Sequence, residues 1–431
     1  MTEPAVHPRP VRPLWPASKW RTAFGRIPHN ERVIYWEMVF LSVMSAAALS
    51  YLGVYLTRLG ASAWLVTALS SAPALVTIVL AIPAGMAVER STNLVRTTNI
   101  GRLIFRTTLA SFALLPLLPA QIATHLMVIV YTLLAVPGLS ANIAYLNILG
   151  KATTAERRPQ MLTTRMAVNG LVASLTGFLA GKWLTSAAYP LNYQVLFIVS
   201  GLAGMASIYA LTKLRLPPEP PPTVRRTVTL RSLLDAFRQA PAFRRWALVS
   251  FFFRLALAMP QALYVIYRVR VLGASDYWIG ILILVDNGLS VITYLLLSRL
   301  IRNKRFSRYL WISGMGTMFY PVLTAMATTP QALVIPSVVN AFFGAGMNSF
   351  ITNTLYGMLP PENHASFLAA DTMLANVALV LGPLLGTLLT DQLGIRVGLL
   401  AIGIIRLITG LMFKVFKVGT QGLPTENERT V

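Results

Sequence analysis

The sequence predicts an all-α integral membrane protein with twelve transmembrane helices in two pseudo-symmetric six-helix bundles. The first observation is composition, because 55% of the residues are hydrophobic and only 12% are charged. Soluble domains carry about 25% charged residues, and a soluble core could not hide this much apolar surface. The second observation is a series of long apolar segments, and the third is a pair of short phrases repeated in the two halves of the chain.

Twelve segments have the length needed to cross a bilayer, which takes about 20 mostly apolar residues. The first six are each separated by short polar connections, and the last six follow a longer polar stretch. In chain order they cover residues 33–56, 64–88, 99–118, 121–147, 164–187, 193–212, 246–267, 278–299, 308–327, 332–356, 367–390 and 395–414.

The apolar segments divide the chain into two bundles, 33–212 and 246–414, flanked by polar tails at 1–32 and 415–431. The connecting loop, 213–245, begins with a proline-rich stretch that predicts a stiff spacer. Leucines and a phenylalanine then recur at helical spacing, with arginines on the other faces. This pattern predicts a short amphipathic helix, lying on the membrane surface or packed on the protein itself.

The distribution of Lys and Arg predicts the orientation of the chain. The N-terminal tail, the loop 213–245 and the segment 299–308 are rich in basic residues, whereas the connections on the opposite side carry few. The positive-inside rule then places both termini in the cytoplasm. We expect the protein to lie in the cell membrane. The net charge of +23 therefore reflects topology and contact with anionic membrane lipids, and we expect no nucleic-acid partner.

Two phrases occur at matching positions in the two bundles. LGAS follows the first span of each bundle, at 59–62 and at 272–275. GFLAGKWLTS at 177–186 and GPLLGTLLTD at 382–391 lie in the fifth span of each bundle. We expect the LGAS phrases to form short outer turns that touch no substrate. Paired bundles of this kind are typical of secondary transporters, whose substrate site lies at mid-membrane between the repeats.

The connection after the second span carries a motif that resembles a known family. The stretch PAGMAVERSTNLVR has a glycine, three residues, an acid and an arginine, at Gly85, Glu89 and Arg90. This pattern is similar to the signature loop of the major facilitator superfamily. The family's second glycine is replaced by Thr92. With the twelve spans and the repeat, the resemblance covers nearly the whole chain.

The resemblance implies the family fold, with alternating access between two bundles and a conformational gate at the signature loop. It implies that Glu89 docks near the start of the helix at Ser366–Phe367. It also implies a cavity lined by the first, fourth, seventh and tenth helices. The polar candidates for this substrate cavity are Asn142, Tyr145, Arg254, Gln261, Tyr264, Asn287, Asn340 and Asn348. Each of them also fits an ordinary contact between helices.

Two acids inside the apolar spans, Glu37 and Asp286, are the candidates for proton coupling. A carboxyl group is costly inside a membrane, so its presence there indicates a function. The alternative interpretation is structural: Arg254 and Asp286 form a static buried pair, and Arg102 or Arg106 neutralises Glu37. For Arg406, in the last span, we expect a structural partner.

The expected function is secondary active transport of a small organic molecule, coupled to protons. We expect a monomer without cofactor or metal, and no enzyme, because the chain has no cysteine, only four histidines and none of the common hydrolase, metalloprotease or nucleotide-binding motifs. Apolar cavity helices favour an amphipathic substrate, and efflux is the direction considered first. Nutrient uptake, and a non-transporting sensor or scaffold derived from a transporter, remain open alternatives.

Overall fold

The computed structural model describes most of the two bundles. The described residues are 27–89, 91, 93–154, 156–216, 241–301, 306–358 and 364–418. The predicted amphipathic helix of the loop 213–245 lies outside them, as do residues 1–26 and 419–431 of the two tails.

The first bundle consists of helices whose bounds follow the apolar segments closely. A π-helical turn, η1, interrupts the first of them, and a short 3-10 helix, η2, extends the third. The elements are α2 (His29–Met44), η1 (Ser45–Leu49), α3 (Ser50–Arg58), α4 (Ala63–Glu89), α5 (Leu94–Ser111), η2 (Phe112–Leu117), α6 (Ala120–Leu133), α7 (Ala135–Lys151), α8 (Arg158–Ser186) and α9 (Leu191–Thr212).

The second bundle repeats this plan with more interruptions. Its first helix breaks between α11 and α12, and its third breaks between α14 and α15. The elements are α11 (Pro241–Ala258), α12 (Gln261–Ile266), η3 (Tyr267–Val271), α13 (Asp276–Ile301), α14 (Phe306–Gly316), α15 (Phe319–Met326), η4 (Gln331–Leu333), α16 (Val334–Met358), α17 (His364–Leu393) and α18 (Ile395–Val415).

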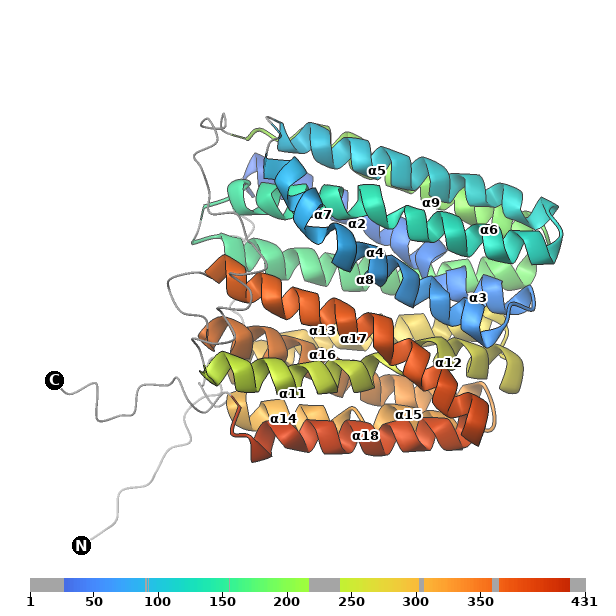
Figure 1. The fold of residues 1–431 in the computed structure, drawn as a ribbon. Coiled ribbons are helices and arrows are strands. Elements are labelled where there is room, and N and C mark those ends of the chain that lie inside the picture. Colours follow the sequence, from blue (N-terminus) through green and yellow to red (C-terminus); the bar gives the residue numbers. More distant parts are fainter. Residues whose placement is uncertain are drawn as a thin grey trace, which may run out of the picture.

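The two bundles lie side by side with their helices roughly aligned (Figure 1). Along the boundary between them, α8 packs on α13 and α4 packs on α17. We call this boundary the seam. The short helices α3 and α12 lie at one end of the assembly, next to the two LGAS loops, and we call this the LGAS end (Figure 1).

The described residues contain ten helices long and apolar enough to cross a membrane. The two remaining predicted spans, 164–187 and 308–327, correspond to α8 and to the broken pair α14 and α15. The helix α8 has 29 residues, but it carries several charged and amide side chains. These side chains lower the hydropathy of α8. The helix tolerates them because one of its faces packs at the seam instead of facing lipid.

One buried arginine explains how the second bundle tolerates its two breaks. Proline has no N–H, so Pro260 and Pro321 leave the carbonyls four residues earlier, Ala256 and Thr317, without a helical partner. The guanidinium of Arg406 donates to both carbonyl oxygens, at 3.2 Å each. The side chain is buried and has the structural role that the sequence predicts.

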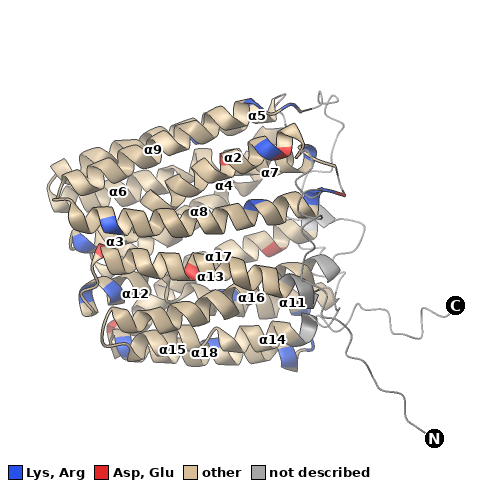
Figure 2. Ribbon diagram, turned by 180° about the vertical axis from the view of Figure 1, so that it is seen from behind, with Lys and Arg blue, Asp and Glu red and all other residues tan. Residues whose placement is uncertain are grey.

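Charged residues gather toward the two ends of the bundle and are sparse in its middle (Figure 2). Burying a charge in hydrocarbon is costly, so the few that lie along the middle are expected to have partners or a function. Those in the described part of the chain define the sites below.

Candidate functional site

The two LGAS phrases form matching tight turns. Gly60 has φ of 82° and Gly273 has φ of 60°, a backbone conformation that glycine adopts without a side-chain clash. In the first turn the hydroxyl of Ser62 accepts a hydrogen bond from the backbone N–H of Leu65 at 3.2 Å, which caps the start of α4. The predicted turns are therefore confirmed.

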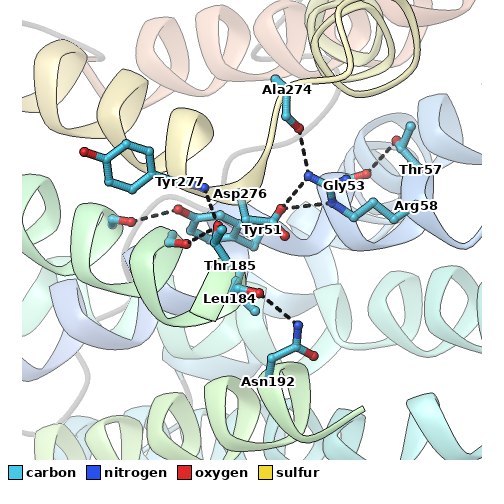
Figure 3. Close-up of polar contacts among 12 residues, drawn as sticks. Tyr51, Gly53, Thr57, Arg58, Leu184, Thr185, Asn192, Ala274, Asp276 and Tyr277 are labelled. Atoms are coloured by element: carbon cyan, nitrogen blue, oxygen red, sulfur yellow. Dashed lines mark hydrogen bonds and ion pairs between the residues drawn. The ribbon is translucent and has the colours of Figure 1, made fainter. Parts of the chain in front are cut away.

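The structure brings these two turns together across the seam (Figure 3). Arg58, just before the first LGAS, donates to the carbonyl oxygen of Ala274 in the second, at 2.8 Å. Arg270, just before the second LGAS, donates to the carbonyl oxygen of Ala61 in the first. Arg58 also forms an ion pair with Asp276 at 2.9 Å. We call this reciprocal set of contacts the arginine clasp. Each bundle contributes one arginine, and a backbone carbonyl oxygen in each bundle accepts a hydrogen bond from the arginine of the other.

Close helix packing extends the clasp along the seam. A Cβ atom at Gly181 of α8 would overlap the carbonyl oxygen of Asp276 at the start of α13, so only glycine fits there. The backbone N–H of Tyr277 donates to the hydroxyl of Thr185 at 2.9 Å (Figure 3). On the other side of the seam, the hydroxyls of Thr67 in α4 and Thr387 in α17 are 2.6 Å apart.

The polar contacts at the opposite end lie within bundles, as far as the described ranges extend. Glu31 of α2 is buried and bound by Arg157, with 2.8 Å between Oε1 and Nε. Thr153 donates to the same oxygen at 2.7 Å. The hydrogen bond to this carboxylate raises the pKa of Arg157 above its ordinary value. All three residues belong to the first bundle, so this pair does not join the two halves.

A pocket of about 600 Å³ lies beside the clasp, on the side of the first bundle. Its lining includes Arg58 and Asp276 of the clasp and the aromatic side chains of Tyr55 and Tyr193, whose ring centroids are 4.4 Å apart. The substrate-cavity candidates from the sequence do not line it. Opening the clasp would therefore change the wall of this pocket.

Glu37 lies at the centre of a charged cluster in the first bundle. Its side chain is fully buried, and each carboxylate oxygen has a donor. Arg102 donates to Oε1 at 2.8 Å, and the hydroxyl of Tyr145 donates to Oε2 at 2.5 Å. Arg106 does not take part directly, because its guanidinium donates to the carbonyl of Gly204 at 2.5 Å. Of the two arginines considered for Glu37, Arg102 is the partner.

The alternative interpretation that pairs Arg254 with Asp286 is wrong. Arg254 of α11 instead binds Asp371 of α17 through two parallel hydrogen bonds of 2.9 Å each. The indole N–H of Trp246 adds a third at 3.2 Å. Sequence spacing placed Arg254 and Asp286 at similar depth, but α11 packs on α17, and so the guanidinium meets the acid there.

Asp286 has a milder environment than either of the other acids. It is half-buried on α13, and its Oδ1 accepts a hydrogen bond of 2.8 Å from the amide of Asn340 on α16. The guanidinium of Arg268 donates to the hydroxyl of Tyr320. In the described structure, then, no cation forms an ion pair with Asp286.

The other cavity candidates do not form one cluster. Asn142 and Gln261 are exposed, Asn287 donates to the carbonyl of Ile283 in its own helix at 3.0 Å, and Asn348 lies 3.4 Å from the hydroxyl of Tyr294. The buried hydroxyl of Tyr264 makes no hydrogen bond to a described residue, and its ring lies 4.5 Å from that of Tyr320.

The gate motif is only partly described. Gly85 lies near the end of α4, and Glu89 is the last residue of that helix. The side chain of Glu89 and all of Arg90 lie outside the described residues, as does the side chain of Ser366. The predicted docking of Glu89 therefore stays a prediction.

Sequence reasoning missed two groups of residues. Asp371 stands within the predicted span 367–390, so the rule that singled out Glu37 and Asp286 applied to it as well. The clasp residues Arg58, Arg270 and Asp276 flank the repeated phrase. The two arginines counted only among the few basic residues on that side, and Asp276 was not considered. Their signal was an arginine shortly before each LGAS and an acid directly after the second.

The helices and the paired bundles define a polytopic membrane protein built from two similar halves. A family model described as Major Facilitator Superfamily matches residues 35–329 and 303–430. The chain belongs to this superfamily, and it is a transporter rather than an enzyme.

Two solved structures show the same fold. The nucleoside transporter NupG aligns with a TM-score of 0.65 and 14% identity, over 90% of this chain and all (100%) of that one. The human organic anion transporter MFSD10 (TETRAN) aligns with a TM-score of 0.64 and 12% identity, over the same shares, 90% and 100%. At these identities the likeness concerns the fold. A comparison with curated proteins found no match.

Proposed function

We propose that this chain is a proton-coupled secondary transporter that moves a small organic molecule by alternating access between its two bundles. The arginine clasp carries the proposal. Hydrogen bonds between described residues of the two bundles lie at the LGAS end, whereas Glu31 and Arg157 at the other end stay within one bundle. This arrangement fits a state that is closed at the LGAS end and that opens there when the clasp separates.

The distribution of Lys and Arg assigns the two ends of the transporter to the two sides of the membrane. The basic tail, the loop 213–245 and the segment 299–308 belong on the cytoplasmic side by the positive-inside rule. The LGAS end then faces outward from the cell membrane, and both termini are cytoplasmic. The closed clasp therefore makes this an outward-closed state.

Asp286 is the better of the two candidates for proton coupling. Glu37 is held by a guanidinium and a phenol, so protonating it would leave Arg102 buried without a counter-charge. Asp286 accepts from an amide, and the neutral acid can keep that contact. A proton can therefore bind and leave Asp286 with little rearrangement of its partners.

The substrate is an amphipathic organic compound in this proposal, because the described bundle interior is mainly apolar with isolated polar groups. The names of the two structural relatives refer to nucleosides and to organic anions, and both are small molecules of mixed polarity. Export is the direction we favour. Uptake is the alternative direction. A sensor or scaffold is the other alternative, and it would move no substrate across the membrane.

Cysteine accessibility tests the clasp, because the chain contains no cysteine. Ser174 on α8 is buried and would face Gly288 of α13, so Ser174→Cys reports on the seam with almost no change in size. We expect the double variant Arg58→Ala/Arg270→Ala to raise its reaction with an impermeant maleimide, added on the LGAS side, by about tenfold or more. Charge-assisted hydrogen bonds contribute about 1.5–3 kcal/mol each.

The matched control is Lys182→Ala, which removes an exposed cation near the same end of α8. It should leave the reaction rate of the reporter unchanged. If the rate is also unchanged in the double arginine variant, the clasp does not hold the bundles together and the proposal loses its support.

A further inference from the structure

The charges around Glu37 do not balance. The guanidinium carbons of two arginines lie near the ring of Tyr145, that of Arg102 at 4.1 Å and that of Arg165 at 5.3 Å from the centroid. Glu37 is the single acid that the described structure places in this cluster, and it already forms an ion pair with Arg102. The charge of Arg165 therefore has no counter-charge among the described residues.

Arg165 is half-buried, and the innermost nitrogen of its guanidinium has no described partner. This Nε makes no hydrogen bond to a described residue, and the described residues give Arg165 no ion pair. Arg102 and Arg106, in contrast, donate to Glu37 and to Gly204. An arginine inside a membrane protein is costly unless an acid, a carbonyl or a ligand accepts from it. The missing acceptor is the observation that points to a ligand.

A second donor lies one helical turn from Arg165. Residues four apart lie on the same helix face, so Asn169 is its neighbour on α8. The amide oxygen of Asn169 accepts from the hydroxyl of Ser42 at 3.0 Å, which leaves the amide N–H₂ group to donate elsewhere. The exposed Asn142 lies one turn from Tyr145 on α7. Asn169 thus adds a neutral donor beside the guanidinium of Arg165.

Arg165 also lies on the helix that moves against the other bundle in the proposed cycle. It is about 10 Å along α8 from Arg158, at 1.5 Å per residue. About one and a half turns further along, α8 packs directly on α13, where a Cβ at Gly170 would meet Val291. A ligand held by Arg165 would therefore lie next to the seam.

We infer that Arg165 and Asn169 bind the carboxylate of a monoanionic amphipathic substrate. A guanidinium presents two parallel N–H groups that match the two oxygens of a carboxylate, and the negative charge of a carboxylate offsets the unpaired charge of Arg165. This inference rests on the proposed transport function and names the charge of its substrate.

Matched probes test the charge preference. The full chain is placed in phosphatidylcholine nanodiscs, and its melting temperature is followed by tryptophan fluorescence. The probes are acetate, benzoate and 4-phenylbutyrate, with 4-phenylbutyramide and 4-phenylbutylamine as neutral and cationic counterparts of the last. We expect at least one carboxylate to raise the melting temperature, and the amide and the amine to have no such effect.

Variants assign the effect to Arg165. Arg165→Gln should weaken the apparent affinity for the carboxylate about tenfold to a hundredfold, and Arg165→Lys should retain part of it. Arg396→Gln, which removes an arginine whose Nε donates to the hydroxyl of Tyr267 at 3.3 Å, should keep the carboxylate shift. Without any probe, Arg165→Gln should melt at or above the wild-type temperature because an unbalanced charge is removed.

Three results would overturn the inference: no shift with any carboxylate, equal shifts with amide and amine, or an unchanged carboxylate shift in Arg165→Gln. A marked drop in the probe-free melting temperature of Arg165→Gln would also do so, since it would reveal a structural partner. Discs that contain phosphatidylglycerol test whether a lipid headgroup is the ligand. If that lipid stabilises wild type but not Arg165→Gln, and free carboxylates have no effect, the ligand is a phosphate headgroup. None of these outcomes depends on the maleimide test, so transport can hold while this inference fails.

Discussion

Glu37 in the first bundle and Asp286 in the second are both acids within membrane helices, but their surroundings differ. Glu37 is fully buried and receives a guanidinium and a phenol, within a cluster that contains a further arginine. Asp286 is half-buried and receives an amide. An acid that neutralises a fixed cation is suited to hold helices together, whereas one with a neutral partner can change its protonation state. Four substitutions sharpen or break this comparison.

The largest effect is expected for Glu37→Gln. The change leaves Arg102 and Arg165 without an acid in their cluster, and breaking a buried pair costs about 3–5 kcal/mol. Thermal unfolding in detergent should show a large drop in melting temperature or a loss of folded protein. The double variant Glu37→Gln/Arg102→Gln should recover part of the loss. A single variant as stable as wild type would mean that Glu37 is not a structural acid.

A slightly smaller loss, about 3 kcal/mol, is expected for Asp371→Asn. The substitution removes the charge that binds Arg254 through two hydrogen bonds, and Arg254 is a little more exposed than Arg102, at 17% against 12% of its side chain. Thermal unfolding measures it, with Asp371→Asn/Arg254→Gln as the compensating variant. If the loss is negligible, the pair is not what holds α11 to α17.

Tyr145→Phe should cost about 2 kcal/mol, because it removes a hydrogen bond to a charged group. Tyr264→Phe is the matched control in the second bundle, since its buried hydroxyl makes no hydrogen bond to a described residue. That control should be close to neutral in the same unfolding measurement. Equal losses in the two variants would show that the contact to Glu37 adds nothing beyond tyrosine packing.

The smallest change in stability, under about 1 kcal/mol, is expected for Asp286→Asn, because an amide can pair with Asn340 in place of the acid. The same variant should lose accumulation driven by an imposed pH gradient in proteoliposomes, measured with a substrate found by thermal-shift screening. Thr293→Ser, two turns further along α13, should keep it, because the hydroxyl of Thr293 donates to the carbonyl of Leu289 in its own helix. Full coupling in Asp286→Asn would remove this acid from the mechanism.

Much of the architecture followed from sequence patterns. Apolar runs of about 20 residues predict the helical segments. The two that do not qualify as membrane-length apolar helices are α8, which is more polar, and the broken pair α14 and α15. The LGAS repeat identified the two bundles and the glycine turns at Gly60 and Gly273. The motif at Gly85 and Glu89 pointed to the superfamily that the family comparison confirms.

The sequence by itself determined that this chain is a membrane transporter built from two related bundles, because hydropathy and turn residues act over a few neighbouring positions. The tertiary structure decided which side chains meet. Asp371 rather than Asp286 binds Arg254, and the two LGAS turns contact each other instead of only ending helices. Such partners depend on how each helix is rotated and on which helix it packs against. Those choices are set by the packing of the whole bundle, so no local spacing encodes them.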